Sequence, residues 1–319
     1  MASPVAWQAL AMVWQPVARP GVQTFRATRG SAHEVVCISR RCEETGRGGR
    51  LLLAIIAAAQ QRPLVTEDPE TIGAGRLLLE TGLDYGKSVK YPASGLEGDL
   101  LRFPLIGISV GLSSIAEIQI DGGLYNHLNI TSRESAPLSD MVTANGDSTS
   151  SVEDMVIATK VRIVSETDSR PSFGLRFATK LPNASNESGL GLDTTDFYAS
   201  VLGAKTIRRA RVVGNIGLGI LGDPTRGDQQ NDVLTYGFSM ARALTQQAEL
   251  VGEINGRIST REGGPPPGTE SRGIVRLGAR YTLGTWRGDA AVLFGVTSSD
   301  PSIGFAAGFT WVFNAFQIP

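Results

Sequence analysis

Charged residues recur at every second position in several stretches of this sequence, with apolar residues between them. Lys160 and Arg162, for example, alternate with Val161 and Ile163. A period of two is typical of an extended strand, because successive side chains of a strand point to opposite faces. The pattern therefore predicts sheets with one charged face and one apolar face.

The charged faces hold the candidate functional residues. Early strands supply acidic residues, the next pair supplies basic ones, and later strands carry both. Neighbouring strands of opposite sign can pair across a lumen, so two interpretations use the same residues. One is a salt-bridge network that only stabilises, and the other is a polar path whose charge ladder selects solutes. The lumen-lining candidates are Glu80, Asp84, Glu117, Asp121, Lys160, Arg162, Arg176, Lys180, Glu249, Glu253, Arg257, Arg276 and Arg280.

The same spacing predicts about twelve strands, an even number as in single-chain bacterial barrels. The predicted connections alternate between long and short, with long polar loops at 126–152, 182–194 and 259–270 and a polar loop through Pro92 and Gly98. Short periplasmic turns and longer outer loops are typical of outer-membrane barrels, whereas a soluble sandwich predicts no such alternation. The strands are expected at 76–85, 101–112, 116–121, 155–163, 173–181, 196–204, 211–221, 233–243, 248–258, 275–283, 286–296 and 303–313.

The last predicted strand is the most aromatic, with Phe305, Phe309, Trp311 and Phe313 on one face. Gly308, Trp311 and Phe313 also match the C-terminal signal that the barrel-assembly machinery of bacterial outer membranes reads. Alternation alone cannot say which face of a barrel points inward. An export signal, this aromatic strand and the loop alternation together favour charges inside and apolar side chains toward lipid.

The export signal is the apolar run at 51–59, which arginines precede and three alanines end. This layout predicts a secretory signal peptide. We therefore expect a presequence at 1–59, an extended periplasmic lead-in at 60–73 and the barrel at 74–316, and we interpret the residues before about 36 as an upstream start chosen in error. Cleavage removes Cys37 and Cys42, which excludes a disulfide in the mature chain.

Composition excludes several other functions. A formal net charge of -1 gives no field that favours nucleic acid. The sequence lacks the run of about 20 apolar residues that a spanning helix needs, so a membrane form must be a barrel. The glycines at 217–222 spell a dinucleotide fingerprint, but a loop follows them where the phosphates need a helix.

A serine hydrolase needs a histidine beside its serine, and His127 is the one histidine that remains after cleavage. It lies at the edge of a long loop, where a surface histidine is the simpler interpretation. Acidic residues near 187–196 match no calcium loop. We therefore expect no catalytic residues, no cofactor and no metal.

One likeness rests on two blocks of the sequence. Residues 75–80 open the barrel, and 174–180 lead through Leu181-Pro182 and a glycine-rich stretch at 189–196 to Phe197. The chain resembles, over most of 70–316, the bacterial family of outer-membrane transporters assigned to the MetA pathway of phenol degradation. Members more often have Thr-Gly where this chain has Asn183-Ala184. The resemblance implies a channel for small molecules, with hydrophobic or aromatic compounds among them, and carries no catalytic residues.

Together these observations predict an all-β protein, a transmembrane antiparallel barrel surrounded by outer-membrane lipids. We expect a passive channel for a small-molecule solute. The alternatives are a structural or surface-interaction barrel with a plugged lumen, and an outer-membrane hydrolase.

Overall fold

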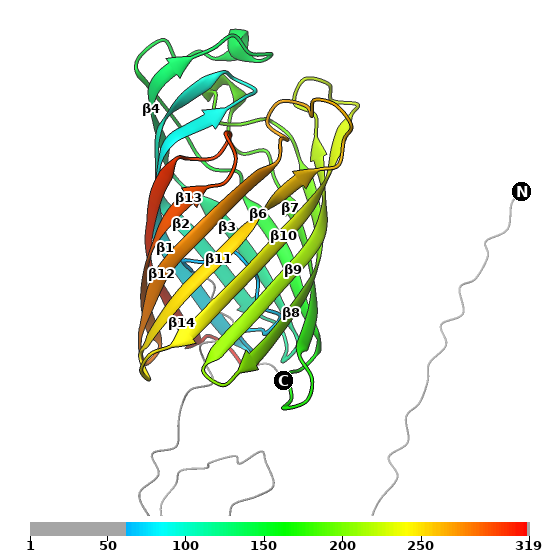
Figure 1. The fold of residues 1–319 in the computed structure, drawn as a ribbon, viewed down its shortest axis with the longest axis vertical. Coiled ribbons are helices and arrows are strands. Elements are labelled where there is room, and N and C mark those ends of the chain that lie inside the picture. The colour runs from blue at the N-terminus through cyan, green and yellow to red at the C-terminus, as the bar shows by residue number, and fades with distance from the viewer. Residues whose placement is uncertain (1–61, 318–319) are drawn as a thin grey trace, which may run out of the picture. The chain divides into compact units, whose positions relative to one another are not determined.

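The computed structural model describes residues 62–317, and the expected presequence lies outside them. The described chain forms one antiparallel sheet that closes on itself as a barrel (Figure 1). Two short 3₁₀ turns, η1 (Ser139–Met141) and η2 (Asn186–Ser188), lie in its loops. The strands are β1 (Arg76–Tyr91), β2 (Leu96–Gly111), β3 (Ala116–Gly123), β4 (Asn126–Arg133), β5 (Ser148–Ser151), β6 (Val156–Val164), β7 (Ser172–Lys180), β8 (Asp196–Ile207), β9 (Ala210–Gly222), β10 (Gln230–Ala243), β11 (Ala248–Ser259), β12 (Arg272–Leu283), β13 (Trp286–Gly295) and β14 (Ile303–Asn314).

Pairing of the first strand with the last closes the barrel. β1 pairs with β14 from Arg76 opposite Asn314 to Lys87 opposite Ile303, and it pairs with β2 on its other side. β3 and β4 follow each other in the chain and both pair with β2. On their other side, β3 pairs with β6 and β4 pairs with β5. β3 with β4 and β5 with β6 each act as one interrupted wall strand, so the barrel has the twelve strands that the sequence predicted.

The connections confirm most of the predicted alternation. Short turns at 112–115, 208–209, 244–247 and 284–285 lie at the lower end in Figure 1, and long loops at 134–147, 181–195 and 260–271 lie at the upper end. Two expectations were wrong. The first connection is a tight turn at 92–95, because β1 and β2 run further than expected. The stretch 126–152 is also no single loop, since β4 and β5 extend the wall there.

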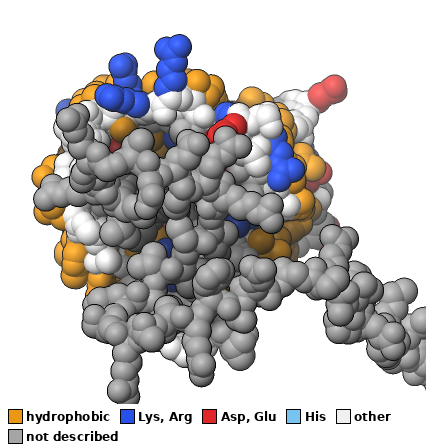
Figure 2. Space-filling view, turned by 90° about the horizontal axis from the view of Figure 1, so that it is seen from below, with side chains coloured by type: hydrophobic (Ala, Val, Ile, Leu, Met, Phe, Trp, Pro, Cys, Tyr) orange, Lys and Arg blue, Asp and Glu red, His pale blue; other side chains and the backbone are white. Residues whose placement is uncertain are grey.

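The two faces of the wall differ as the periodicity predicted. Phe177 is 54% exposed and Ile163 is 62% exposed on the outer face, whereas Lys160 and Glu117 are fully buried on the inner one. Seen from the lower end, hydrophobic side chains lie along much of the visible rim of the barrel (Figure 2). Pairing of β1 with β14 closes the wall, so the long strands leave no open edge to lipid, which is what a lipid environment requires. Among the described strands, the short strand β5 pairs only with β4.

Aromatic side chains gather at the lower end of β13 and β14. Trp286 and Trp311 face each other across the two strands, with their rings stacked 4.9 Å apart, and Phe313 lies 4.2 Å from Trp311. Aromatic rings are enriched where a barrel meets the membrane interface. Among residues 62–317, no helix has the length and apolarity to cross a membrane.

Residues 62–75 form a feature that the sequence did not predict. We expected an extended periplasmic lead-in at 60–73. From Arg62 onward this segment runs inside the barrel instead, along the inner wall, and then turns into β1. We call residues 62–75 the belt.

Candidate functional site in the barrel lumen

The belt crosses almost the whole inner circumference of the barrel. It starts with Arg62 against β1 and β14, passes β11 at Thr66 and β9 at Asp68, and reaches β6 at Glu70. It then passes β3 at Ile72 before it joins β1. Strands far apart in the sequence are thereby linked through one short segment.

Lumen side chains take the place of a neighbouring strand for the belt backbone. Glu253 accepts from the amides of Val65 and Thr66 at 2.9 and 2.8 Å. Asn215 accepts from the Glu67 amide at 2.6 Å and donates to the Glu67 carbonyl at 2.7 Å. Buried backbone groups must find partners, and these contacts supply them without a sheet ladder. The belt is therefore built into this lumen.

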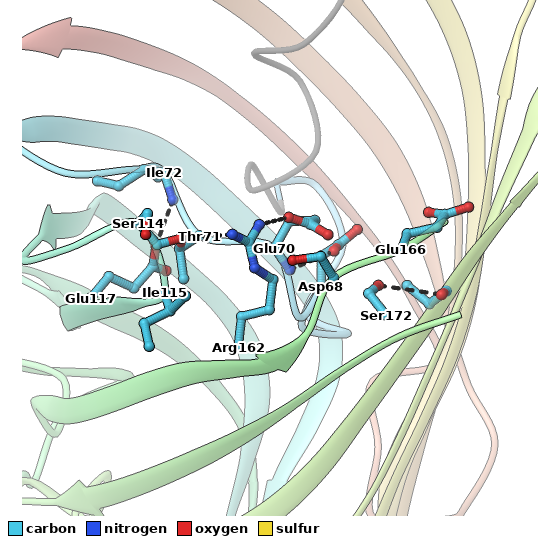
Figure 3. A network of polar contacts seen from close by, with 12 residues as sticks. Asp68, Glu70, Thr71, Ile72, Ser114, Ile115, Glu117, Arg162, Glu166 and Ser172 are labelled. Carbon is cyan, nitrogen blue, oxygen red and sulfur yellow. Dashed lines mark hydrogen bonds and ion pairs between the residues drawn. The ribbon is translucent and has the colours of Figure 1, made fainter. Parts of the chain in front are cut away.

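The acidic residues of the belt match basic residues of the wall. Glu67 lies between Arg176 at 3.1 Å and Lys160 at 3.4 Å. Figure 3 shows Glu70 beside Arg162, and the Ile72 amide near the carboxylate of Glu117, which accepts from it at 2.7 Å. The belt thus uses several of the basic side chains that the sequence assigned to the lumen.

Asp68 connects the belt to a turn at the lower end. It pairs with Arg211 of β9, and Arg211 Nη1 also lies 2.9 Å from Glu166 in the 165–171 turn. Burial opposes ionisation of Glu166, but hydrogen bonds from the Thr206 amide and from Arg211 outweigh it and hold the Glu166 pKa below its usual value. Glu166 therefore stays charged and keeps Arg211 in place for Asp68.

The remaining predicted lumen residues pair mainly with their neighbours on the wall. Lys160 and Glu117 form a fully buried pair at 3.0 Å, and Arg276 and Glu253 pair at 2.8 Å. Lys180 bridges Asp154 and Asp196, on either side of it, at 2.9 and 3.0 Å. These pairs make the wall rigid.

The other predicted lumen residues also have partners in the barrel. Asp84 pairs with Arg102 at 2.9 Å, Glu249 lies 3.9 Å from Arg280, Asp121 lies 3.8 Å from Arg176, and Glu80 accepts from Thr310 Oγ1 at 3.1 Å. Arg257 differs from the rest, because it donates to two backbone carbonyls of the 260–271 loop.

A cavity of about 360 Å³ lies beside the belt. Val65, Thr66 and Glu67 of the belt line one side of it. The wall contributes polar side chains, among them Tyr198, Asn255, Arg257 and Arg272. This volume falls in the range of small-molecule pockets.

His127 has a more specific setting than the sequence suggested. Its Nδ1 lies 2.9 Å from Ser150 Oγ, and its Nε2 lies 3.2 Å from Asn129 Oδ1. The serine comes from β5 and the asparagine from β4, and all three side chains lie on the outer face. Among the described residues, no group of His, Cys, Asp and Glu side chains could hold a metal ion.

Sequence reasoning missed the belt and its partners Arg211 and Asn215. It also missed two lumen arginines, Arg102, which pairs with Asp84, and Arg272, which lines the cavity. One signal was available: three acidic residues at 67, 68 and 70 directly precede the first strand. An acidic segment next to a barrel with a basic inner wall is a candidate for insertion.

No protein-family model matches the chain, and no curated protein matches it either. Among solved structures, the COG4313 outer membrane channel from Pseudomonas putida F1 matches with a TM-score of 0.55 at 11% identity, over 77% of this chain and 98% of that one. The KdgM porin matches with a TM-score of 0.45 at 8% identity, over 74% of this chain and 99% of the porin. The first match shows a common fold, and the second is too weak to support an argument.

The fold is that of an outer-membrane β-barrel. Its apolar outer surface, buried inner charges and short lower turns agree with that assignment.

Proposed function

We propose that this protein is a passive outer-membrane channel for small molecules, including the hydrophobic or aromatic compounds that the family resemblance implies, and that the belt is its gate. The arrangement of the belt carries the proposal. It lies across a polar lumen, and its strongest contacts are ion pairs and hydrogen bonds that water can replace. A segment held in this way can move without exposing a large apolar core.

The two ends of the belt are held differently. Ile72 packs with Leu78 and Val312 in a small buried apolar cluster, which fixes the end next to β1. Glu67, Asp68 and Glu70 are held by charge. We therefore expect residues 62–70 to move and residues 72–75 to act as the hinge.

Conductance across planar bilayers tests the proposal. The variant Glu67→Gln/Asp68→Asn/Glu70→Gln removes the charges that hold the belt and should open more often than the wild type. A matched control, Glu134→Gln/Asp140→Asn/Asp228→Asn, removes the same number of charges from exposed outer loops and should behave as wild type. An aromatic solute added to one side should reduce the current if such compounds enter the lumen.

The same experiment addresses the alternative of a structural barrel with a plugged lumen. The dense contacts of the belt are the observation in favour of that alternative. If neither the wild type nor the belt variant shows conductance steps at any voltage, the channel is rejected and the plugged barrel stands.

The hydrolase alternative has one observation in its favour, the contact of His127 with Ser150. If Nε2 donates to Asn129, Nδ1 is free to accept the serine proton, as general-base catalysis needs. Hydrolysis of a short-chain ester that disappears in Ser150→Ala and in His127→Ala would support it. If the folded wild-type protein hydrolyses no ester, the hydrolase alternative is rejected.

A further inference from the structure

Three pairs of charged residues face each other across strands β11 and β12, and we call each pair a rung. Two rungs join residues of opposite sign, whereas the third joins two arginines. Like charges directly opposite each other destabilise a sheet unless something neutralises them. The three rungs are Glu249 opposite Arg280, Glu253 opposite Arg276, and Arg257 opposite Arg272.

The two arginines of the third rung lack a carboxylate partner. Within the part of the chain that the structure describes, neither guanidinium has an acidic oxygen within the 4.0 Å of an ion pair. Arg257 donates to the carbonyls of Glu270 at 2.9 Å and Gly268 at 2.7 Å, and Arg272 donates to the carbonyl of Lys90 at 3.0 Å. A carbonyl oxygen carries only a partial charge, so the rung keeps two positive charges.

The nearby acid of the cavity wall is used elsewhere. Asp300 accepts through Oδ2 from the Gly273 amide at 2.9 Å, and from the amide and hydroxyl of Thr297 at 3.0 and 2.7 Å. Glu67, on the belt side, lies between Lys160 and Arg176.

Glu270 is the third acid near the rung, and its Oε1 accepts from the Gly268 amide at 2.8 Å. Glu270 and Asp300 act on Arg272 electrostatically, but none of the three carboxylates forms an ion pair with either arginine of the rung. The two guanidinium groups therefore still have room for direct contact with an anion.

Arg257 and Arg272 line the cavity of about 360 Å³ described above. Its other lining residues provide a polar side chain, Asn255, and apolar surface, such as Leu202 and Ile274. The cavity thus combines a doubly positive wall with room for a small hydrocarbon group.

We propose that this cavity binds a small organic carboxylate, with its two oxygens on Arg257 and Arg272 and its hydrocarbon part toward Leu202 and Ile274. A planar guanidinium matches a carboxylate with two parallel hydrogen bonds, and such charge-assisted bonds are stronger than neutral ones. The site gives the channel a solute class, and in that respect it rests on the proposed function. Binding itself does not need conduction.

Calorimetry on the detergent-folded full chain tests the site. Benzoate is the probe, benzamide is its neutral counterpart, and inorganic phosphate is an oxyanion without a hydrocarbon part. We expect benzoate to bind about tenfold or more tightly than either, with an affinity that falls as salt rises. Equal binding of benzoate and benzamide would overturn the site, and phosphate as tight as benzoate would overturn the carboxylate assignment.

Charge-removing variants locate the site. Arg257→Gln and Arg272→Gln should each weaken benzoate binding about tenfold or more, because each removes one charge-assisted contact. Arg261→Gln is the matched control, since Arg261 is an exposed arginine of the same loop and should bind benzoate as wild type. Folding of both variants is checked on a gel, where a folded barrel changes its migration only after boiling. Wild-type affinity for benzoate in folded Arg257→Gln and folded Arg272→Gln would refute the proposal.

Failure of this inference differs from failure of the channel. A protein that conducts but does not bind benzoate refutes the carboxylate site and leaves the channel. A protein that binds benzoate but never conducts refutes the channel and leaves the site.

Discussion

Single charged side chains inside this barrel are expensive to bury, and the structure offsets that cost by pairing them. Lys160 is fully buried between Glu117 and Glu67, and Arg276 is buried against Glu253. Taking a charge out of water costs several kcal/mol unless a partner replaces the solvent. Inner-wall residues should therefore be far more sensitive to substitution than charged residues at the rim.

Lys160→Met should destabilise the barrel by about 3–5 kcal/mol, because it leaves Glu117 and Glu67 buried with less compensation. Lys90→Met is the control, since Lys90 pairs with Glu97 near the surface, and exposed pairs contribute only about 0–1 kcal/mol. Urea unfolding of both variants in lipid vesicles measures the difference. Similar losses in the two variants would mean that Lys160 is not buried as described.

Glu166 gives a pH dependence with a defined sign. Its pKa is lowered from 4.5 in the folded protein, so its contribution to the free energy of unfolding is fully present above pH 4.5 and is lost as pH falls through the folded pKa. Wild type should therefore exceed Glu166→Gln in stability at pH 7, and the gap should close below pH 4.5. A gap that stays constant down to pH 3 would contradict this assignment.

At the level of the strands, alternation decides which environment each side chain meets. On β7, Phe173 and Phe177 are exposed on the outer face, and Gly174 and Ala178 are buried on the inner one. The outer row forms part of the surface that meets lipid. A charge placed in that row should therefore be costly, although the position is open to the surroundings.

Phe177→Arg should lower the free energy of unfolding in vesicles by about 2–4 kcal/mol if position 177 lies near the bilayer midplane. Ser135→Arg, in an exposed outer loop, should have almost no effect. Denaturant titration of both variants provides the comparison. A Phe177→Arg protein as stable as the Ser135→Arg protein would place the outer face in water.

The wall strands could be predicted from sequence because their signal is local. A period of two in 155–163 or 173–181 fixes both the strand and its faces. β4 and β5 were not predicted as strands, because they lie above the apolar band of the outer face. Their outward positions, such as Asn129 and Ser150, are polar, so their two faces differ little in polarity. Alternation placed Arg162 and Arg176 on one face, and the export signal, the aromatic last strand and the loop alternation assigned that face to the lumen.

The belt could not be predicted in this way, since residues 62–75 have no periodicity. Its partners lie far away in the sequence: Thr66 meets Glu253, and Asp68 meets Arg211. The cross-strand pair of Arg257 and Arg272 also needed the register of β11 and β12, which sequence spacing does not supply.

At the scale of the whole molecule, the proposed gate depends on how the belt fits inside the barrel. The twelve-stranded wall is closed, so in the channel that we propose the passage for solutes depends on movement of the segment inside it. The inner wall leaves room for that segment at Gly237, where an added Cβ would lie 3.4 Å from the Thr66 Cβ. That separation is close to the Cβ–Cβ distance of a disulfide.

Single-channel conductance of Thr66→Cys/Gly237→Cys, with Cys37 and Cys42 replaced by serine, tests the gate most directly. The oxidised protein should show no openings, because the disulfide fixes the belt to β10, and a reductant should restore the openings of the reduced control. Equal conductance in the oxidised and reduced states would show that solutes pass without any movement of the belt.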